Sequence, residues 1–195
     1  MDIKKLCLSL VVSCMLAFAS LSILFTNVAN AIEFKPSRKD VNEAVKFGEL
    51  HSGTDILKTV RLKQAIYGNW PNSDGGFIKS KLIRLSVSAA MNAQMDKKLT
   101  EEDINEILKS DELEILGNAR EELGAFPKKI SIKLKQGDKV IKPKEMRPGI
   151  MRRENWTSVY AVFPYSSIDP MAKTKITFRV NSHEREYELD FSKIK

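Results

Sequence analysis

The stretch Ile176 to Phe191, ITFRVNSHEREYELDF, decides the fold class of the carboxyl-terminal part of this chain. Apolar and polar residues alternate over its first five positions, and they alternate again from Glu186 to Phe191. This period of two is typical of strands with one buried face, and Asn181-Ser182-His183 between the two runs favours a turn. The stretch therefore predicts a β-hairpin.

The same alternation continues upstream as far as Phe126-Pro127, where we place a boundary. Residues 130–135 alternate, and Gly137-Asp138 suits a two-residue hairpin turn before a return strand. Residues 156–163 are apolar on both faces, which indicates a central strand. These short strands with tight connections favour an antiparallel β-sandwich over residues 127–195, immunoglobulin-like in shape.

Residues 32–126 have a mainly helical pattern. We expect helices over 38–50, capped by Ser37, over 80–95, and directly after the capping box Thr100-Glu101-Glu102-Asp103. Residues 58–67 favour a strand over a helix, and residues 111–123 fit either. The chain is thus predicted to be α+β, with a mixed, mainly helical N-terminal part packed against a C-terminal antiparallel β-sandwich.

The first 31 residues have the features of a secretory signal peptide. Lys4 and Lys5 precede a run without charged residues from Leu6 to Val28, and Ala29 and Ala31 form an A-x-A cleavage site. We expect a periplasmic or extracellular protein after cleavage near Ala31. Membrane contact is then transient and limited to the signal peptide.

Two other interpretations of this segment stay open. Residues 6–28 are long enough to span a bilayer, so an uncleaved anchor is one alternative. Val11-Val12-Ser13-Cys14 loosely resembles a lipoprotein signal, which would leave a lipidated Cys14. The small-residue site directly after the apolar run favours cleavage over both.

The expected mature chain lacks the residue patterns of most metal sites and of nucleophilic catalysis. Both cysteines lie within the first 31 residues, so no disulfide is expected. The two histidines, His51 and His183, are far apart and have loop-forming neighbours. The four His or Cys ligands of a structural zinc site are missing, and no G-x-S-x-G motif occurs. We expect no cofactor.

Positive charge is concentrated in one segment. Residues 32–126 contain 14 Lys and Arg against 16 Asp and Glu, whereas residues 128–153 contain ten basic and two acidic residues. Alternation along a strand places Lys133 and Lys135 on one outer face. Candidate anion-binding residues in the segment are Lys133, Lys135, Lys142, Arg152 and Arg153. The simpler interpretation is a solvated edge strand on which lysines prevent aggregation.

The loop from Asn69 to Gly76 offers a second candidate contact. Trp70 lies there between turn-forming residues, and an exposed indole could stack on a sugar or a partner. A tryptophan packed over the edge of the core is the simpler interpretation. Asp74 has oxygen-bearing neighbours, but the spacing of a calcium loop is absent.

Two functions fit these observations. The first is an exported, non-enzymatic binding or accessory protein whose basic patch contacts an acidic envelope polymer, a lipid headgroup or an acidic protein surface. Nucleic acid is not expected as a partner, because the chain is exported and has no nucleic-acid motif. The alternative is a carboxylate-dependent hydrolase of cell-wall polymer or glycan, which only the compartment and the number of acids favour. Glu101, Glu102, Asp103, Glu121 and Glu122 could pair for acid–base chemistry, but adjacent helical positions do not face each other, so helix caps and solvated faces are the simpler interpretation.

Overall fold

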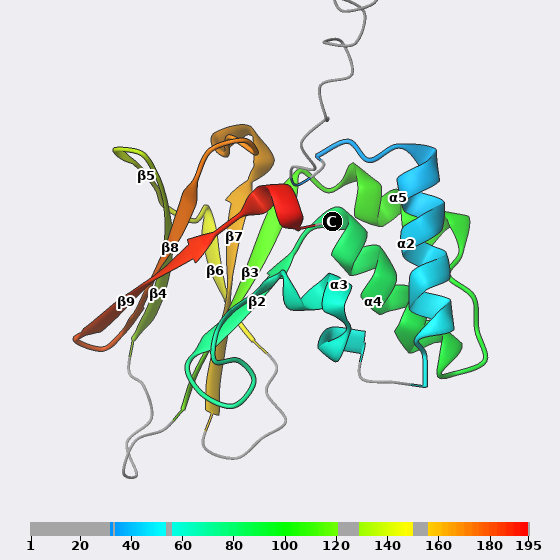
Figure 1. Ribbon diagram of the computed structural model, residues 1–195, viewed down its shortest axis with the longest axis horizontal. Coiled ribbons are helices and arrows are strands. Elements are labelled where there is room, and N and C mark those ends of the chain that lie inside the picture. Colours follow the sequence, from blue (N-terminus) through cyan, green and yellow to red (C-terminus); the bar gives the residue numbers. More distant parts are fainter. Residues whose placement is uncertain (1–31, 33, 54–55, 121–128, 150–155, 195) are drawn as a thin grey trace, which may run out of the picture.

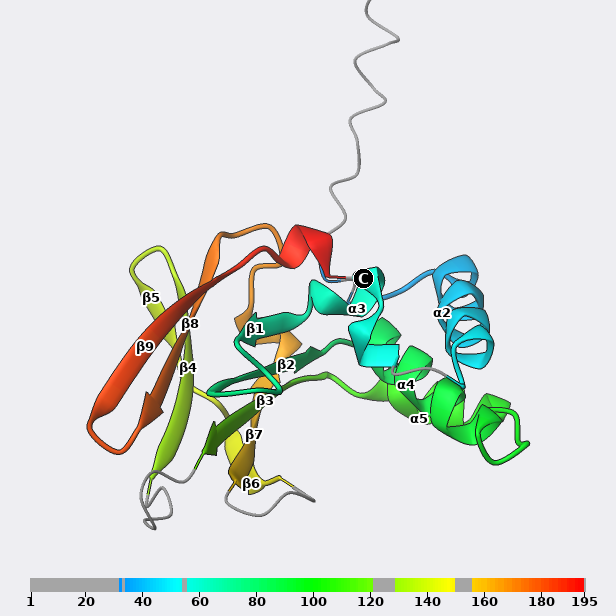
Figure 2. The same ribbon diagram turned by 60° about the horizontal axis from the view of Figure 1, so that its bottom comes forward.

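Two antiparallel β-sheets face each other, and a group of helices lies beside them (Figures 1 and 2). The computed structural model describes residues 32, 34–53, 56–120, 129–149 and 156–194. In these residues, three helices of nine residues or more, all before the last seven strands, accompany a five-stranded and a four-stranded sheet. The predicted α+β class with a sandwich-like β region is therefore confirmed at this level.

Each of the three longer helices begins at a side-chain cap that the sequence shows. In α2 (Arg38–Leu50) the cap is Ser37, and in α4 (Lys81–Ala93) it is Ser80. In α5 (Glu101–Lys109) Thr100 and Asp103 bond each other's backbone N–H groups, as a capping box requires. The helices predicted over 38–50, over 80–95 and after Thr100 are confirmed.

Helices α2 and α4 pack very closely because small residues meet at their crossing. A Cβ on Gly48 would lie 2.8 Å from the Cβ of Ala89, and the Ser86 hydroxyl donates to the Ala44 carbonyl oxygen at 3.0 Å. Helix α5 completes this group, since its Ile107 packs in the same small apolar cluster. The helices thus have their own core beside the larger core of the sheets.

The preference for a strand over residues 58–67 is wrong for most of that range. A 3₁₀ turn η2 (Ile56–Lys58) and a short helix α3 (Val60–Lys63) precede strand β1 (Ile66–Gly68). Leu62 and Ala65 are both fully buried. Residues three positions apart lie on the same side of a helical turn, whereas in a strand they would point to opposite faces. Tertiary burial outweighs the short alternation here.

The five-stranded sheet joins strands from distant parts of the chain. Its order is β1, β2 (Gly75–Lys79), β3 (Glu112–Arg120), β7 (Trp156–Pro164) and β6 (Glu145–Pro148). Residues 112–120, left open by the sequence, form a strand paired on both sides, and β7 is an inner strand as predicted. Strands from both sides of residue 126 therefore share one sheet.

The four-stranded sheet is made entirely of residues beyond 129. Its order is β5 (Lys139–Ile141), β4 (Ile130–Gln136), β8 (Thr174–Val180) and β9 (His183–Leu189). Both predicted hairpins are confirmed, because Gln136 pairs with Lys139 and Val180 pairs with His183. Phe191 lies past the end of β9, in the 3₁₀ turn η4 (Phe191–Lys193).

The core lies between the two sheets. Ile132, Leu134, Ile176 and Phe178 from the four-stranded sheet are in one buried cluster with Tyr67, Ile78, Ile115 and Ala161 from the other. Apolar burial of this kind is the main source of stability in a chain whose described residues contain no cysteine. The outer face of the four-stranded sheet is left to solvent.

Candidate functional site

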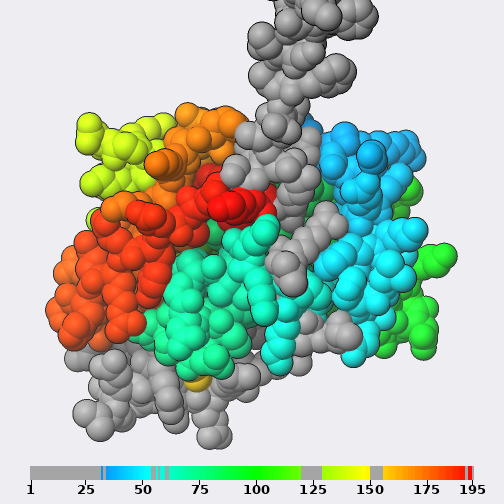
Figure 3. Space-filling model, viewed as in Figure 1, coloured from blue at the N-terminus to red at the C-terminus, as the bar shows by residue number. Residues whose placement is uncertain are grey.

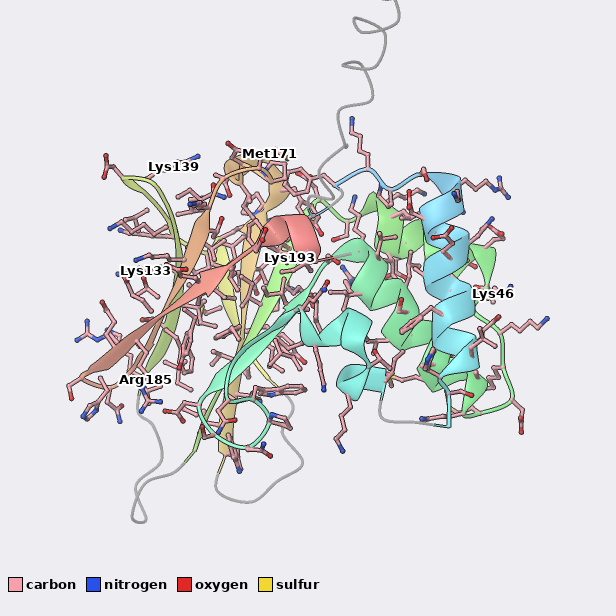
Figure 4. All side chains as sticks on the ribbon, viewed as in Figure 1. Lys46, Lys133, Lys139, Met171, Arg185 and Lys193 are labelled. Atoms are coloured by element: carbon pink, nitrogen blue, oxygen red, sulfur yellow. The ribbon has the colours of Figure 1, made fainter. Side chains whose placement is uncertain are left out.

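The basic segment folds as an inner strand with its lysines pointing outward. On β4, Ile132 and Leu134 are fully buried, so Lys133 and Lys135 project from the opposite, outer face. Figure 4 shows Lys133 and Lys139 on the side of the molecule away from the helices. At Lys135, β4 lies between β5 and β8, so the interpretation as edge-strand protection does not hold for that lysine. Strand β5 pairs only with residues 134–136, so Lys133 lies beyond the paired part of β4 on that side, and the interpretation stays open for it.

Strand register brings further lysines beside them. Lys135 lies directly opposite Val140 of β5 on one side and Lys175 of β8 on the other. Exposed Lys142 directly follows β5, one residue past Ile141, whose partner on β4 is Leu134. We call Lys133, Lys135, Lys142 and Lys175 the basic face.

The acidic residues of this sheet are segregated at its other edge. Glu184, Glu186 and Glu188 of β9 share the outer face, and Glu186 forms an ion pair with Lys175 at 3.3 Å. Among the described residues, Lys133, Lys135 and Lys142 form no ion pair. Lys175 thus lies between Lys135 on one side and Glu188 on the other. Like charges directly opposite in a sheet repel, so an anion between Lys135 and Lys175 would reduce their repulsion.

A cavity of about 700 Å³ opens at one end of this face. Lys135, Lys175, Glu188 and Leu189 line it from the sheet, and the loop before β8 and the turn η4 supply most of the rest of the lining. On the molecular surface the segments around residues 170 and 190, orange and red, lie directly against each other (Figure 3). We call this cavity the sheet-end pocket.

Of the predicted anion-binding residues, the structure brings three together. Lys133 and Lys135 share the outer face of β4 and Lys142 follows the adjacent strand β5, whereas Arg152 and Arg153 lie outside the described residues. The sequence interpretation missed Lys175. Its outward direction follows from the alternation with buried Ile176, but its place opposite Lys135 depends on a register that no local pattern reveals.

Trp70 lies on a different surface of the molecule. Its ring stacks on Phe77 with centroids 5.7 Å apart, and its indole N–H donates to the side-chain oxygen of Asn118 when that amide is oriented to accept it. These contacts are on the outer side of the five-stranded sheet, so Trp70 does not contribute to the basic face.

The remaining sequence candidates have local structural roles. His51 caps the end of α2, where its Nδ1 bonds the Phe47 carbonyl oxygen at 2.8 Å. His183 is the first residue of β9 rather than a loop residue. Glu101, Glu102 and Asp103 form the first turn of α5, and Glu121 and Glu122 lie outside the described residues.

Within the described part of the chain, no three His, Cys, Asp or Glu side chains are grouped so that they could hold a metal ion. In the same residues, no helix has the length and apolar character needed to cross a bilayer. Comparison of the chain with protein-family models, with curated proteins and with solved structures gave no match.

Proposed function

We propose that this protein is an exported, non-enzymatic binding or accessory protein that contacts an anionic component of the cell envelope through its basic face. The observation that carries this proposal is the direct pairing of Lys135 with Lys175 across two inner strands, next to Lys133. Only Lys175 of these three has an acidic partner among the described residues.

The arrangement suits a repetitive or multivalent anion. Side chains directly opposite on a sheet have Cβ atoms about 5 Å apart, so neighbouring lysines can contact adjacent acidic groups of one polymer or surface. Such contacts are screened by salt, and each lysine near an anionic surface contributes about 1 kcal/mol. An acidic polysaccharide, a lipid headgroup or an acidic protein face offers this chemistry.

Charge-neutral variants test the proposal. Replacement of Lys133, Lys135 and Lys142 together by Gln is expected to weaken binding to dextran sulfate about 100-fold at low salt. The matched control replaces the exposed lysines Lys46, Lys97 and Lys98 of the helical part by Gln, which removes the same charge far from the sheet. The control should bind as the unmodified protein does.

Two outcomes decide this experiment. Loss of binding in the sheet variant alone supports a localised binding face, and a pull-down from envelope extract with the same three proteins then identifies the natural partner. Equal loss in both variants would mean that only net charge matters, and the proposal would fail.

Export is a separate part of the proposal and rests on residues 1–31, which lie outside the described residues. Mass spectrometry of the mature protein tests it. An N-terminus at Ile32 supports cleavage, an N-terminus at lipidated Cys14 indicates a lipoprotein, and an intact Met1 in the cell interior contradicts export.

We propose an immunoglobulin-like shape for the sandwich and a change of domain near residues 126 and 127. Separate expression of residues 32–126 and 127–195 tests the division, since β3 and β7 pair along nine residues and would be separated by it. Two folded fragments would support the boundary, and two unfolded ones would oppose it.

A further inference from the structure

The sheet-end pocket combines an apolar wall with a ring of lysines. Its apolar lining comes from Pro170, Met171, Ala172, Leu189 and Phe191, and its cationic lining from Lys135, Lys173, Lys175 and Lys193. We propose that this pocket binds an amphiphilic anion, meaning a single phosphate or carboxylate group attached to an apolar chain. The inference deepens the proposed function, with which it shares Lys135 and Lys175.

Four lysines and two acids, Glu188 and Asp190, line the pocket, so its lining carries a net charge of +2 (four minus two). Lys193 is held by Asp190 at 2.9 Å, and Lys175 is held by Glu186 at 3.3 Å. Lys135 and Lys173 form no ion pair among the described residues. An ammonium donates strong hydrogen bonds to phosphate or carboxylate oxygens, so these two lysines are the expected headgroup contacts.

An anionic headgroup alone would leave the apolar wall of the pocket exposed to water. Met171 is 62% exposed, whereas Leu189 and Phe191 of the same lining are almost fully buried, so Met171 supplies most of the exposed apolar surface among these three. In Figure 4 Met171 lies at the top of the sheets and Lys193 lies below it, toward the middle of the molecule. An exposed thioether adapts to apolar ligands of varied shape, and an apolar chain in contact with it would be removed from water.

The pocket is built on a rigid support. The buried side chain of Gln136 donates to the Asp169 carbonyl oxygen at 2.7 Å and to Thr174 Oγ1 at 2.8 Å, and it accepts from the Asp169 N–H at 3.0 Å. Asp169 Oδ1 in turn accepts from the Met171 N–H at 2.9 Å. Gln136 thus fixes the loop that carries Met171 and Lys173, which makes it a positioning residue.

The size of the pocket agrees with a small ligand. Pockets for small molecules commonly have volumes of about 300 to 1,000 Å³, mainly apolar walls and a few placed polar groups. At about 700 Å³ the sheet-end pocket falls within this range. A bare inorganic anion would leave the wall around Met171 in water, whereas an amphiphile covers it.

Calorimetric titration with four probes tests the inference. Decyl phosphate and decanoate, both kept below micelle formation, carry the full chemistry, while inorganic phosphate and decanol carry only the headgroup or only the chain. We expect the two amphiphiles to bind at least about tenfold more tightly than either partial probe. Equal affinity for decyl phosphate and inorganic phosphate would overturn the apolar part of the site.

Surface variants locate the binding without disturbing the core. Lys173→Gln and Met171→Ser should each weaken decyl phosphate binding about tenfold. The matched control is Met91→Ser on α4, because Met91 is 59% exposed and far from the pocket. Unchanged affinity in both pocket variants would overturn the inference.

A separate variant distinguishes the pocket from the basic face. Lys142→Gln should weaken dextran sulfate binding and leave decyl phosphate binding unchanged, since Lys142 does not line the pocket. If dextran sulfate binding depends on Lys133 and Lys142 while decyl phosphate does not bind, the pocket inference fails and the proposed function stands. If decyl phosphate binds while dextran sulfate binding does not depend on Lys133 and Lys142, the proposed function fails and the pocket inference stands.

Vesicles identify the source of the ligand. If the headgroup belongs to a bilayer, vesicles containing phosphatidylglycerol should sediment with the unmodified protein and much less with Lys173→Gln. If the ligand is a free amphiphile, decyl phosphate binds and the vesicles do not. Vesicle binding that is insensitive to both Lys173→Gln and Met171→Ser would contradict a role for the pocket.

Discussion

Gly76 of β2 and Gly117 of β3 lie directly opposite each other in the five-stranded sheet, and the hydroxyl end of Tyr67 lies over both. The two missing side chains leave the space that this ring occupies between the sheets. The Tyr67 hydroxyl then donates to the Leu116 carbonyl oxygen at 2.9 Å. One large side chain and two glycines therefore set the distance between the sheets at this point.

Substitution of Gly117 by Ala should destabilise the protein. The new Cβ would lie 2.7 Å from Ile132 Cδ1 and 2.8 Å from Phe178 Cε2, so side chains of the facing sheet must move. Such overpacking costs about 1 to 3 kcal/mol of unfolding free energy, measurable by denaturant unfolding. Gly53→Ala is the control, because no atom lies within 4 Å of its added Cβ. Equal stability of the two variants would contradict this account.

Loss of the Tyr67 hydroxyl should also be measurable. Tyr67→Phe keeps the ring between the sheets but removes the bond to the Leu116 carbonyl oxygen, at a cost of about 1 kcal/mol. Tyr160→Phe serves as the control, since Tyr160 is half-buried on the outer side of the sheet. A larger effect at Tyr160 than at Tyr67 would mean that the buried bond contributes little.

The same burial predicts how stability changes at alkaline pH. Burial raises the pKa of Tyr67 well above its usual value, and Tyr187 adds to the rise; burial likewise raises the pKa of Tyr165. The unfolded chain releases these protons first, so the free energy of unfolding falls as the pH rises above about 10. In denaturant unfolding across this range, Tyr67→Phe should lose less stability than the unmodified protein. Parallel curves would count against a raised pKa.

The capping box of α5 predicts an acid-sensitive contribution. The hydroxyl and backbone N–H of Thr100 both donate to Asp103 Oδ2, at 2.6 and 3.0 Å, and these bonds hold the pKa of Asp103 below its usual value. A lowered pKa gives stability above the pKa of the unfolded chain, and that stability is lost as the pH falls through the folded value.

Asp103→Asn should therefore destabilise the protein at neutral pH and progressively less at acid pH. Thermal unfolding followed by circular dichroism, at several pH values, measures the difference from the unmodified protein. Glu101→Gln is the control, because Glu101 is an exposed acid of the same turn and has no part in the capping box. A difference that stays constant down to acid pH would contradict the capping account.

Gln136 should be essential for the loop between β7 and β8. Gln136→Leu leaves the Asp169 N–H and carbonyl oxygen without their side-chain partner, which costs about 2 kcal/mol. Hydrogen exchange should show earlier opening at Met171 and Ala172, whose N–H groups bond Asp169. Gln64→Leu, at an exposed position after α3, is the control. Unchanged hydrogen exchange in the Gln136 variant would mean that the loop keeps its conformation without the Gln136 side chain.

The amino-acid sequence by itself determined the local elements of this protein. Caps at Ser37 and Thr100 mark where two helices begin, and alternation identifies β4, β8 and β9 together with the outward direction of Lys133 and Lys135. These features depend on residues within a few positions of one another. The backbone periods of helix and strand are sufficient to predict them.

Only the tertiary structure decided which strands become neighbours. The pairing of β3 with β7, the helical turn at Leu62, the place of Lys175 opposite Lys135 and the pocket at the sheet end all join distant residues. Strand order and register are selected by which apolar faces can be buried together, and that choice involves the whole chain at once. Local alternation shows which way a lysine points, but not which lysine lies beside it.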